Sequence, residues 1–240
     1  MPRRTDSRPL HQQVAAALRA QIMAGELASG TQLPSTAQLV ETYSASNPTI
    51  QKALALLKDE GYLRSHPGKG VYVRDRESFV VEAGNYFAPS ARGYSYQLLD
   101  VAEVNPPADV AAALGLGDRE RAVVRHRLMS HDGEPVELSH SYYPARLAIG
   151  TPLAGKGKIR GGAPQALADL GSPQRRFTDR LSVRQPTPDE VQLLDLPAEV
   201  PVIRQFRVIY TDDDRPVETT VMVKGGHLYE LLYRVDLAAS

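Results

Sequence analysis

The sequence of 240 residues contains no cysteine, which excludes disulfide bonds, thiolate zinc sites, iron–sulfur clusters and cysteine nucleophiles. It also has no apolar run approaching the roughly 18 residues that indicate a membrane-spanning helix. The basic N-terminal residues are followed by no apolar segment of the kind that signal peptides contain. We therefore expect a soluble, cytoplasmic protein with no membrane partner.

The composition is that of a folded protein with an uneven distribution of charge. Hydrophobic residues make up 42% and charged residues 23%, with 18 Gly and 18 Pro, which excludes a disordered, collagen-like or coiled-coil chain. The formal net charge is zero, but residues 1–76 carry 10 Lys and Arg against 6 Asp and Glu, whereas residues 77–240 carry 18 against 22. A basic unit followed by an acidic one indicates a polyanion-binding domain joined to a second domain.

The first 76 residues have the spacing of three short helices and a hairpin. Apolar periodicity and capping residues predict helices over residues 9–24, 35–43 and 46–60. Short alternating runs on both sides of residues 66–70 predict a hairpin. This is the plan of a winged helix-turn-helix, in which one helix enters the major groove of DNA and the hairpin contacts phosphates. Periodicity alone equally suits a small helical domain whose charges form a solvated face.

Residues 9–76 resemble the DNA-binding domain of the GntR family of bacterial transcription regulators. The resemblance is carried by G-x-x-L-P-S, S-x-x-T-I-x-x-A-L-x-x-L-x-x-E-G and the G-K-G of the hairpin, all at family spacing. It implies that the partner is a double-stranded DNA operator. The candidate DNA contacts are Ser35, Ser46, Asn47, Thr49, Gln51, Lys52, Arg64, Gly68, Lys69 and Gly70.

Three positions depart from the family pattern. Ala37, Asn47 and Gln51 stand where the family often has Arg. Arg pairs with guanine O6 and N7, whereas Asn and Gln pair with adenine N6 and N7. We therefore expect an operator that relies more on A·T pairs than that of a typical member. The lost positive charges also predict weaker non-specific binding or a greater need for dimerisation.

The rest of the chain predicts an antiparallel-sheet α+β domain over residues 95–240, preceded by a linker over residues 77–94. Two hairpins, at 123–143 and 202–223, have similar sequences on both sides of their turns, which predicts two similar strand pairs in one antiparallel sheet. The remaining elements predicted are a strand at 96–104 and helices at 107–114 and 164–170.

The region from about 95 to 236 resembles the UTRA effector-binding domain of the HutC-type branch of the GntR family. The matching segments are the D-G-E-P hairpin, Y-Y-P at 142–144 and R-P-V-E…G-G-H-L-Y-E-L-L-Y. The resemblance implies a fold similar to chorismate lyase, a small-molecule effector as ligand and a homodimer. It implies effector contacts at Arg127, Ser139, Glu218 and Tyr229. Because Met129 replaces the family's second Arg and Ser139 a frequent Glu, a phosphosugar-type ligand is not expected.

Two further groups of residues have alternative interpretations. Arg160, Gly161 and Gly162 before a predicted helix could offer a guanidinium and backbone N–H groups to an anion, although such glycines equally describe a loop. His126 and His140 are expected on facing strands, where histidines are usually ordinary surface or core residues. The six His show no metal-ligand spacing, so we expect no metal site, no cofactor and no catalytic residue.

The sequence therefore predicts a ligand-responsive transcriptional regulator. By family analogy we expect a repressor that binds an inverted-repeat operator as a dimer and is released by a small-molecule effector. An alternative is a chorismate-lyase-like enzyme fused to a DNA-binding module, with Arg127 and Glu218 in its pocket. A third is an architectural DNA-binding protein with no effector. The complete winged unit argues against the enzyme, and the large second domain argues against the architectural protein.

Overall fold

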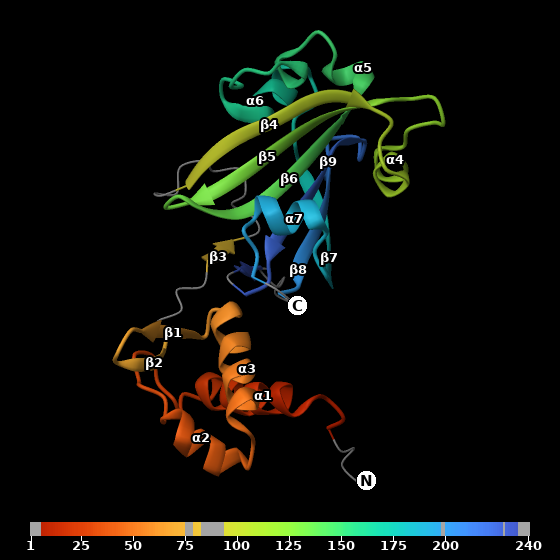
Figure 1. The fold of residues 1–240 in the computed structure, drawn as a ribbon. Helices are drawn as coiled ribbons and strands as arrows, with labels where there is room; N and C mark the ends of the chain where they lie inside the picture. Colours follow the sequence, from red (N-terminus) through yellow and green to blue (C-terminus); the bar gives the residue numbers. More distant parts are fainter. Residues whose placement is uncertain (1–5, 75–78, 83–93, 198–199, 228, 235–240) are drawn as a thin grey trace, which may run out of the picture. The chain divides into compact units, whose positions relative to one another are not determined.

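The computed structural model describes residues 6–74, 79–82, 94–197, 200–227 and 229–234 (Figure 1). The chain divides into two compact units, Met1–Phe79 and Val80–Ser240. Most of the predicted linker lies outside the described residues, but its segment Phe79–Glu82 forms a strand, β3. Among the described residues, no helix is long and apolar enough to cross a membrane.

The first unit contains the three helices and the hairpin that the sequence predicts. They are α1 (Leu10–Met23), α2 (Thr36–Tyr43), α3 (Asn47–Asp59), β1 (Leu63–His66) and β2 (Gly70–Val73). The second and third of these helices begin where a side chain satisfies an N–H group of the first turn. Ser35 and Gln38 form a capping box on α2, and Ser46 caps α3.

The core of the first unit forms where the apolar stripes of the three helices meet. It includes Ile50, Leu54 and Leu57 of α3, all buried, together with Val14 and Leu18 of α1. Leu10, by contrast, is 46% exposed. Leu10 is the first residue of α1, and the buried stripe begins one turn later.

The second unit is built on a six-stranded antiparallel sheet in the order β4-β5-β6-β9-β8-β7. Its strands are β4 (Tyr94–Val104), β5 (Ala122–His131), β6 (Glu134–Pro144), β7 (Arg176–Arg184), β8 (Val202–Tyr210) and β9 (Pro216–Gly225). Both predicted hairpins are confirmed as β5–β6 and β8–β9, and they join through the pairing of β6 with β9. The first hairpin closes through Asp132 and Gly133, both at positive φ (50° and 87°), which the tight two-residue turn requires.

Helices cover both faces of this sheet (Figure 1). Successive residues of a strand face opposite sides, so Tyr143 and Tyr142 belong to different cores. The Tyr143 face is covered by α5 (Ala145–Ala148), the 3-10 helix η2 (Pro152–Ala154) and α6 (Gly162–Asp169). The Tyr142 face is covered by α4 (Ala108–Leu114) and α7 (Pro188–Leu193).

Several elements escape the sequence patterns. The strand β7, at the edge of the sheet, was not predicted, although Phe177, Leu181 and Val183 stand at alternate positions along it. The short helices α5 and α7 and the strand β10 (Tyr229–Leu232) were not predicted either. The strand β10 pairs with β3 in a separate two-stranded sheet.

Candidate DNA-binding surface and effector-binding face

The N-terminal end of α3 presents most of the predicted base contacts to solvent. Asn47, Gln51 and Lys52 are exposed. The hydroxyl of Ser46 accepts the Thr49 N–H at 3.4 Å, and the two hydroxyl oxygens of Ser46 and Thr49 lie 2.8 Å apart. These bonds occupy the capping hydroxyls, so Ser46 and Thr49 set the start of the helix while the exposed side chains face outward.

Gln51 is oriented by a residue that the sequence did not single out. Its Nε2 donates to Oγ1 of Thr36, the first residue of α2, at 3.2 Å. Ser35, immediately before Thr36, is exposed and caps α2. The contact links the two helices of the helix-turn-helix and limits the positions that the Gln51 amide can take.

The hairpin tip presents Lys69 on a constrained backbone. The Lys69 carbonyl accepts hydrogen bonds from Gln32 Nε2 at 2.8 Å and from the Tyr72 hydroxyl at 3.2 Å. Gly70 has a φ of 109°, and a Cβ there would lie 2.8 Å from Gln32 Nε2, so this position requires glycine. Lys69, its neighbour Gly68 and Arg64 on β1 are exposed. Two cations on this hairpin suit the neutralisation of phosphates.

In the second unit, three predicted effector contacts lie on the Tyr143 face of the sheet. The Arg127 Nη2 donates to the Ser141 hydroxyl, which lies 2.8 Å from the Thr220 hydroxyl oxygen. Thr220 in turn donates to Glu218 at 2.8 Å. Ser139 is buried on the same face, two residues before Ser141 on β6. Buried hydroxyls thus connect Arg127 of β5 to Glu218 of β9.

Further donors hold the Glu218 carboxylate in place. The Tyr143 hydroxyl donates to it at 3.1 Å and Gln174 Nε2 at 2.7 Å. Burial, followed by the charge of Glu218, raises the pKa of Tyr143 above its usual value, so the phenol remains a donor. The side-chain oxygens of Glu218 thus accept hydrogen bonds from the uncharged donors Tyr143, Gln174 and Thr220.

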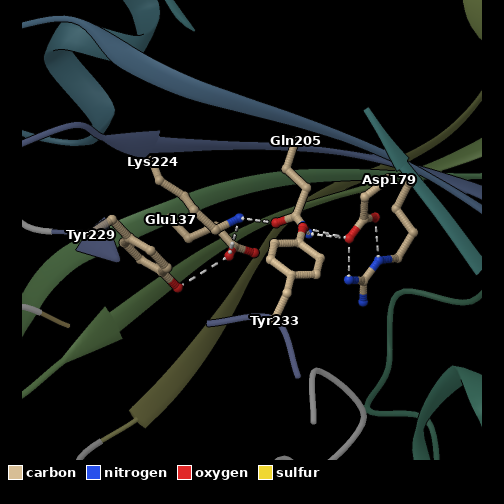
Figure 2. A network of polar contacts seen from close by, with 7 residues as sticks. Glu137, Asp179, Gln205, Lys224, Tyr229 and Tyr233 are labelled. Atoms are coloured by element: carbon tan, nitrogen blue, oxygen red, sulfur yellow. Dashed lines mark hydrogen bonds and ion pairs between the residues drawn. The ribbon is translucent and has the colours of Figure 1, made fainter. Parts of the chain in front are cut away.

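The fourth predicted contact, Tyr229, donates a hydrogen bond to a neighbouring network of charged and polar side chains on the same face (Figure 2). We call this network the buried ionic chain and define it as Glu137, Lys224, Gln205, Asp179 and Arg207. Lys224 Nζ lies 2.9 Å from Glu137 Oε2 and donates to Gln205 Oε1 at 2.9 Å. Gln205 Nε2 donates to Asp179 at 2.9 Å, and Arg207 binds Asp179 through Nε at 2.8 Å and Nη2 at 2.7 Å.

The charges of this chain are enclosed by protein. Glu137 and Lys224 are each 1% exposed, and Arg207 is fully buried. Burial lowers the pKa of Lys224 from its usual value, against the opposing effect of Glu137. Burial alone would raise the pKa of Asp179, but the hydrogen bonds from Arg207 and Tyr233 hold it below its usual value. Each carboxylate is thus stabilised by a cation on an adjacent strand.

The last predicted contacts, Arg160, Gly161 and Gly162, lie in the loop before α6. Arg160 and Gly161 line an open hollow together with Gln165 and Asp169. The Gly162 N–H donates to the Ile159 carbonyl at 3.0 Å and is therefore engaged within the loop. Anion binding here stays a prediction. Because the Gly162 N–H is already used, one backbone donor fewer is left for an anion than the sequence implied.

Comparison with known proteins gives the two units their family. Residues 10–73 match the model of bacterial regulatory proteins of the gntR family, and residues 90–230, more than half of the chain, match that of the UTRA domain. The chain belongs to the GntR family and carries a UTRA domain. Its two units are therefore a GntR DNA-binding domain and a UTRA domain, and the predicted α+β fold class is confirmed.

The relatives of this chain described below are named as transcriptional regulators. An HTH-type transcriptional regulator of Streptomyces coelicolor is 29% identical, with 89% of this chain and 87% of that protein covered. The HTH-type transcriptional repressor NagR of Bacillus subtilis is 25% identical, with 95% of each covered. A crystal structure of a GntR-family regulator, 24% identical, has the same fold with a TM-score of 0.66 over 96% of this chain and 98% of that one. These names point away from an enzyme.

The UTRA domain holds one further buried cation that the sequence did not single out. Arg125, 5% exposed, donates from Nη1 to the Leu153 carbonyl at 3.0 Å and to the Gly155 carbonyl, and from Nη2 to the Gly157 carbonyl at 3.3 Å. It lies two residues before Arg127 and hence on the same sheet face. Arg125 thereby fastens the loop after η2 over this face. The Arg-x-Arg spacing of residues 125 and 127 was the sequence signal that could have placed Arg125 on this face.

Polar residues at alternate strand positions were the signal for the rest of the network. Glu137, Ser139 and Ser141 alternate along β6, but alternation with polar residues usually marks a solvated face. Among the residues that the structure describes, no group of three or more His, Asp or Glu side chains could hold a metal ion.

The histidines predicted on facing strands stack on the Tyr142 side of the UTRA sheet. The His126 and His140 rings lie 3.9 Å apart between centroids at 15°. Burial, followed by the neighbouring His126, lowers the pKa of His140 from 6.5 to about 4, against Glu190 of α7. Burial also lowers the pKa of His126, against Asp100 of β4.

The stacked pair of His126 and His140 predicts that the UTRA domain loses stability as the pH falls. Because the folded-state pKa of His140 is depressed, the unfolded chain binds more protons, and the free energy of unfolding falls as the pH decreases from about 6.5 to about 4. We expect His140→Phe to flatten this dependence in thermal unfolding measured between pH 7 and 5, whereas His11→Phe in the GntR domain leaves it unchanged. An unchanged slope in His140→Phe contradicts the prediction.

Lys69 is predicted to contribute to DNA affinity without sequence preference. Lys69→Ala removes one phosphate-neutralising charge, so it should weaken binding to all sequences alike and reduce the slope of log K against log salt by about 1. Fluorescence anisotropy with random duplex DNA at several salt concentrations measures both quantities. Lys156→Ala in the UTRA domain is the matched control and should leave the slope unchanged. A sequence-dependent loss in Lys69→Ala contradicts a phosphate contact.

Proposed function

We propose that this protein is a repressor that binds an inverted-repeat operator as a homodimer in the cytoplasm and is released by a small-molecule effector. The observation that carries the proposal is the exposed N-terminal end of α3, with Asn47, Gln51 and Lys52 beside a hairpin bearing Arg64 and Lys69. A helix of this kind fits the major groove, and the basic hairpin fits the adjoining phosphates.

The capping and turn residues complete the proposed DNA contacts. Ser35 and Ser46 cap the two helices of the helix-turn-helix and are exposed, and backbone N–H groups at helix N-termini favour phosphate. Gly68 and Gly70 allow the hairpin tip to approach the DNA backbone closely. Asn47 and Gln51 supply amide groups suited to adenine, which supports an operator rich in A·T pairs.

The dimer follows from the size of the recognition unit. A single α3 contacts only a few base pairs, and helix-turn-helix proteins reach operator affinity by pairing two such helices on half-sites one helical turn apart. The relative NagR is named a repressor, which supports repression rather than activation by this protein. The three missing Arg side chains strengthen the need for two half-sites.

The proposed effector site is the Tyr143 face of the UTRA sheet, with Arg127, Ser139, Glu218 and Tyr229 as contacts. Arg127 offers a guanidinium and Glu218 a side-chain hydrogen-bond acceptor, and buried hydroxyls connect them. An effector that prefers one dimer geometry shifts the population away from the geometry that matches the operator. We infer that this face senses rather than catalyses, because the relatives are named regulators.

In-vitro selection of bound DNA with the full-length protein tests the proposal. We expect an A·T-rich inverted repeat, bound with a stoichiometry of two chains per site. Enrichment of a single, non-repeated site would contradict the dimer, and no enrichment over random DNA would contradict the regulator. Assaying the purified protein for turnover of chorismate tests the enzyme alternative, and we expect none.

A further inference from the structure

The link between α1 and α2 runs beside the hairpin of the GntR domain and pairs with β2 on both sides of Gln32. The Val73 N–H donates to the Thr31 carbonyl at 2.8 Å. The Leu33 N–H donates to the Val71 carbonyl, also at 2.8 Å. Leu33 is 5% exposed and belongs to the core of the domain. The backbone of Gln32 is therefore fixed both to the hairpin and to the core.

The side chain of Gln32 reaches from this link to the tip of the hairpin. Successive residues of an extended segment face opposite sides, so Gln32 is exposed while Leu33 is buried. Gln32 Nε2 donates to the Lys69 carbonyl at 2.8 Å. The Tyr72 hydroxyl donates to the same carbonyl at 3.2 Å. Donors from two segments, the link and β2, therefore hold the backbone of Lys69.

The tip is the part of the hairpin that most needs such a restraint. Lys69 stands between Gly68 and Gly70, both at positive φ (72° and 109°), and glycine loses more conformational freedom on ordering than any other residue. A cation on an unrestrained tip must be ordered when it binds a phosphate, and that ordering reduces affinity. The two hydrogen bonds to the Lys69 carbonyl order the tip before any DNA is bound.

We propose that Gln32 is a positioning residue for DNA binding, which holds the hairpin tip so that Lys69 meets a phosphate of the DNA backbone. Gln32 acts through Lys69 and needs no contact with DNA itself. Because the partner of Lys69 is the phosphate backbone, the effect is independent of the base sequence. The effect on DNA binding rests on the proposed function, whereas the ordering of the tip is a property of the free protein.

Gln32→Met tests the proposal, because methionine has nearly the same size as glutamine and lacks its N–H donor. With the full-length protein and random duplex DNA, Gln32→Met should weaken binding roughly fivefold although no charge is removed, since the tip must then be ordered on binding. Fluorescence anisotropy at one salt concentration measures this loss. Gln12→Met on α1 is the matched control and should bind as the wild type does. Unchanged affinity in Gln32→Met overturns its role in DNA binding.

A double-mutant cycle with Lys69→Ala separates positioning from a general loss of structure. If Gln32 acts through Lys69, Gln32→Met should weaken binding less than about twofold in the Lys69→Ala background, because the two changes remove one interaction. An equal loss in both backgrounds would show that Gln32 acts elsewhere in the domain, and the proposal would then be wrong.

Hydrogen exchange of the free full-length protein, followed by mass spectrometry, tests the ordering of the tip without DNA. Gln32→Met should speed exchange roughly fivefold in peptides covering residues 66–72, the effect of losing one uncharged hydrogen bond, and should leave exchange in α3 unchanged. Unchanged exchange at the tip overturns the proposal. If the wild type binds no DNA, the proposed function fails, while this measurement still decides whether Gln32 orders the tip.

Discussion

Replacing Gln51 by Arg is expected to change the preferred base at one position of each half-site from adenine to guanine. An Arg side chain pairs with guanine O6 and N7, whereas the Gln amide pairs with adenine N6 and N7, and a good bidentate pair contributes about 1–3 kcal/mol of discrimination. The wild-type operator should therefore lose affinity for Gln51→Arg roughly tenfold, and an operator with the A-to-G change in both half-sites should regain it.

Selection of bound DNA with the variant, followed by anisotropy on both operators, measures this exchange of preference. Gln12→Arg on α1 is the control for the added charge and should raise affinity for both operators alike. If Gln51→Arg selects the wild-type sequence, Gln51 does not read a base. Thr36→Val is a second test of the same readout: it removes the hydroxyl that orients the Gln51 amide and should reduce discrimination without moving the preferred base.

Removing one charge from the buried ionic chain is expected to cost more stability than removing any exposed charge. Lys224→Met leaves the Glu137 carboxylate buried without its cation, and breaking a buried pair in this way costs about 3–5 kcal/mol. The double variant Glu137→Met/Lys224→Met should recover most of this loss, because apolar residues of similar size replace a fully desolvated pair. Urea unfolding of the full-length protein measures the four free energies of the cycle.

The exposed pair of Arg146 and Glu120 supplies the matched control. Its side chains are 55% and 45% exposed, so Arg146→Met should cost less than about 1 kcal/mol. Equal losses in Lys224→Met and Arg146→Met would show that the ionic chain is solvated in solution. A loss in the double variant as large as that in Lys224→Met would show that the fold needs the pair itself.

Local signals made the GntR domain predictable from its residues. Ser35 and Ser46 mark the helix starts by capping, a mechanism that acts within one turn. The buried residues of α3 repeat at helical spacing and meet the stripes of two nearby helices. Because all of these interactions span short stretches of chain, their spacing is visible in the sequence.

The UTRA hairpins were equally visible in the sequence, but the burial of the polar residues on their strands was not. The Asp132–Gly133 turn and the alternation of β5 and β6 depend on neighbouring residues only. Glu137 and Lys224, by contrast, look like solvated strand residues and are each 1% exposed. The edge strand β7, which supplies Asp179, has apolar residues at alternate positions, but two of them, Leu181 and Val183, are 49% and 69% exposed.

The sequence by itself therefore determined the family, the α+β fold class and the two central hairpins, since their signals lie in residues close together in the chain. Only the tertiary structure decided which polar residues are buried and which of them pair. That choice follows from the strand order β6-β9-β8-β7, which brings Glu137, Lys224, Gln205 and Asp179 onto one face. The free energy of burying these charges depends on the partners that the sheet places beside them, and no local pattern specifies those partners.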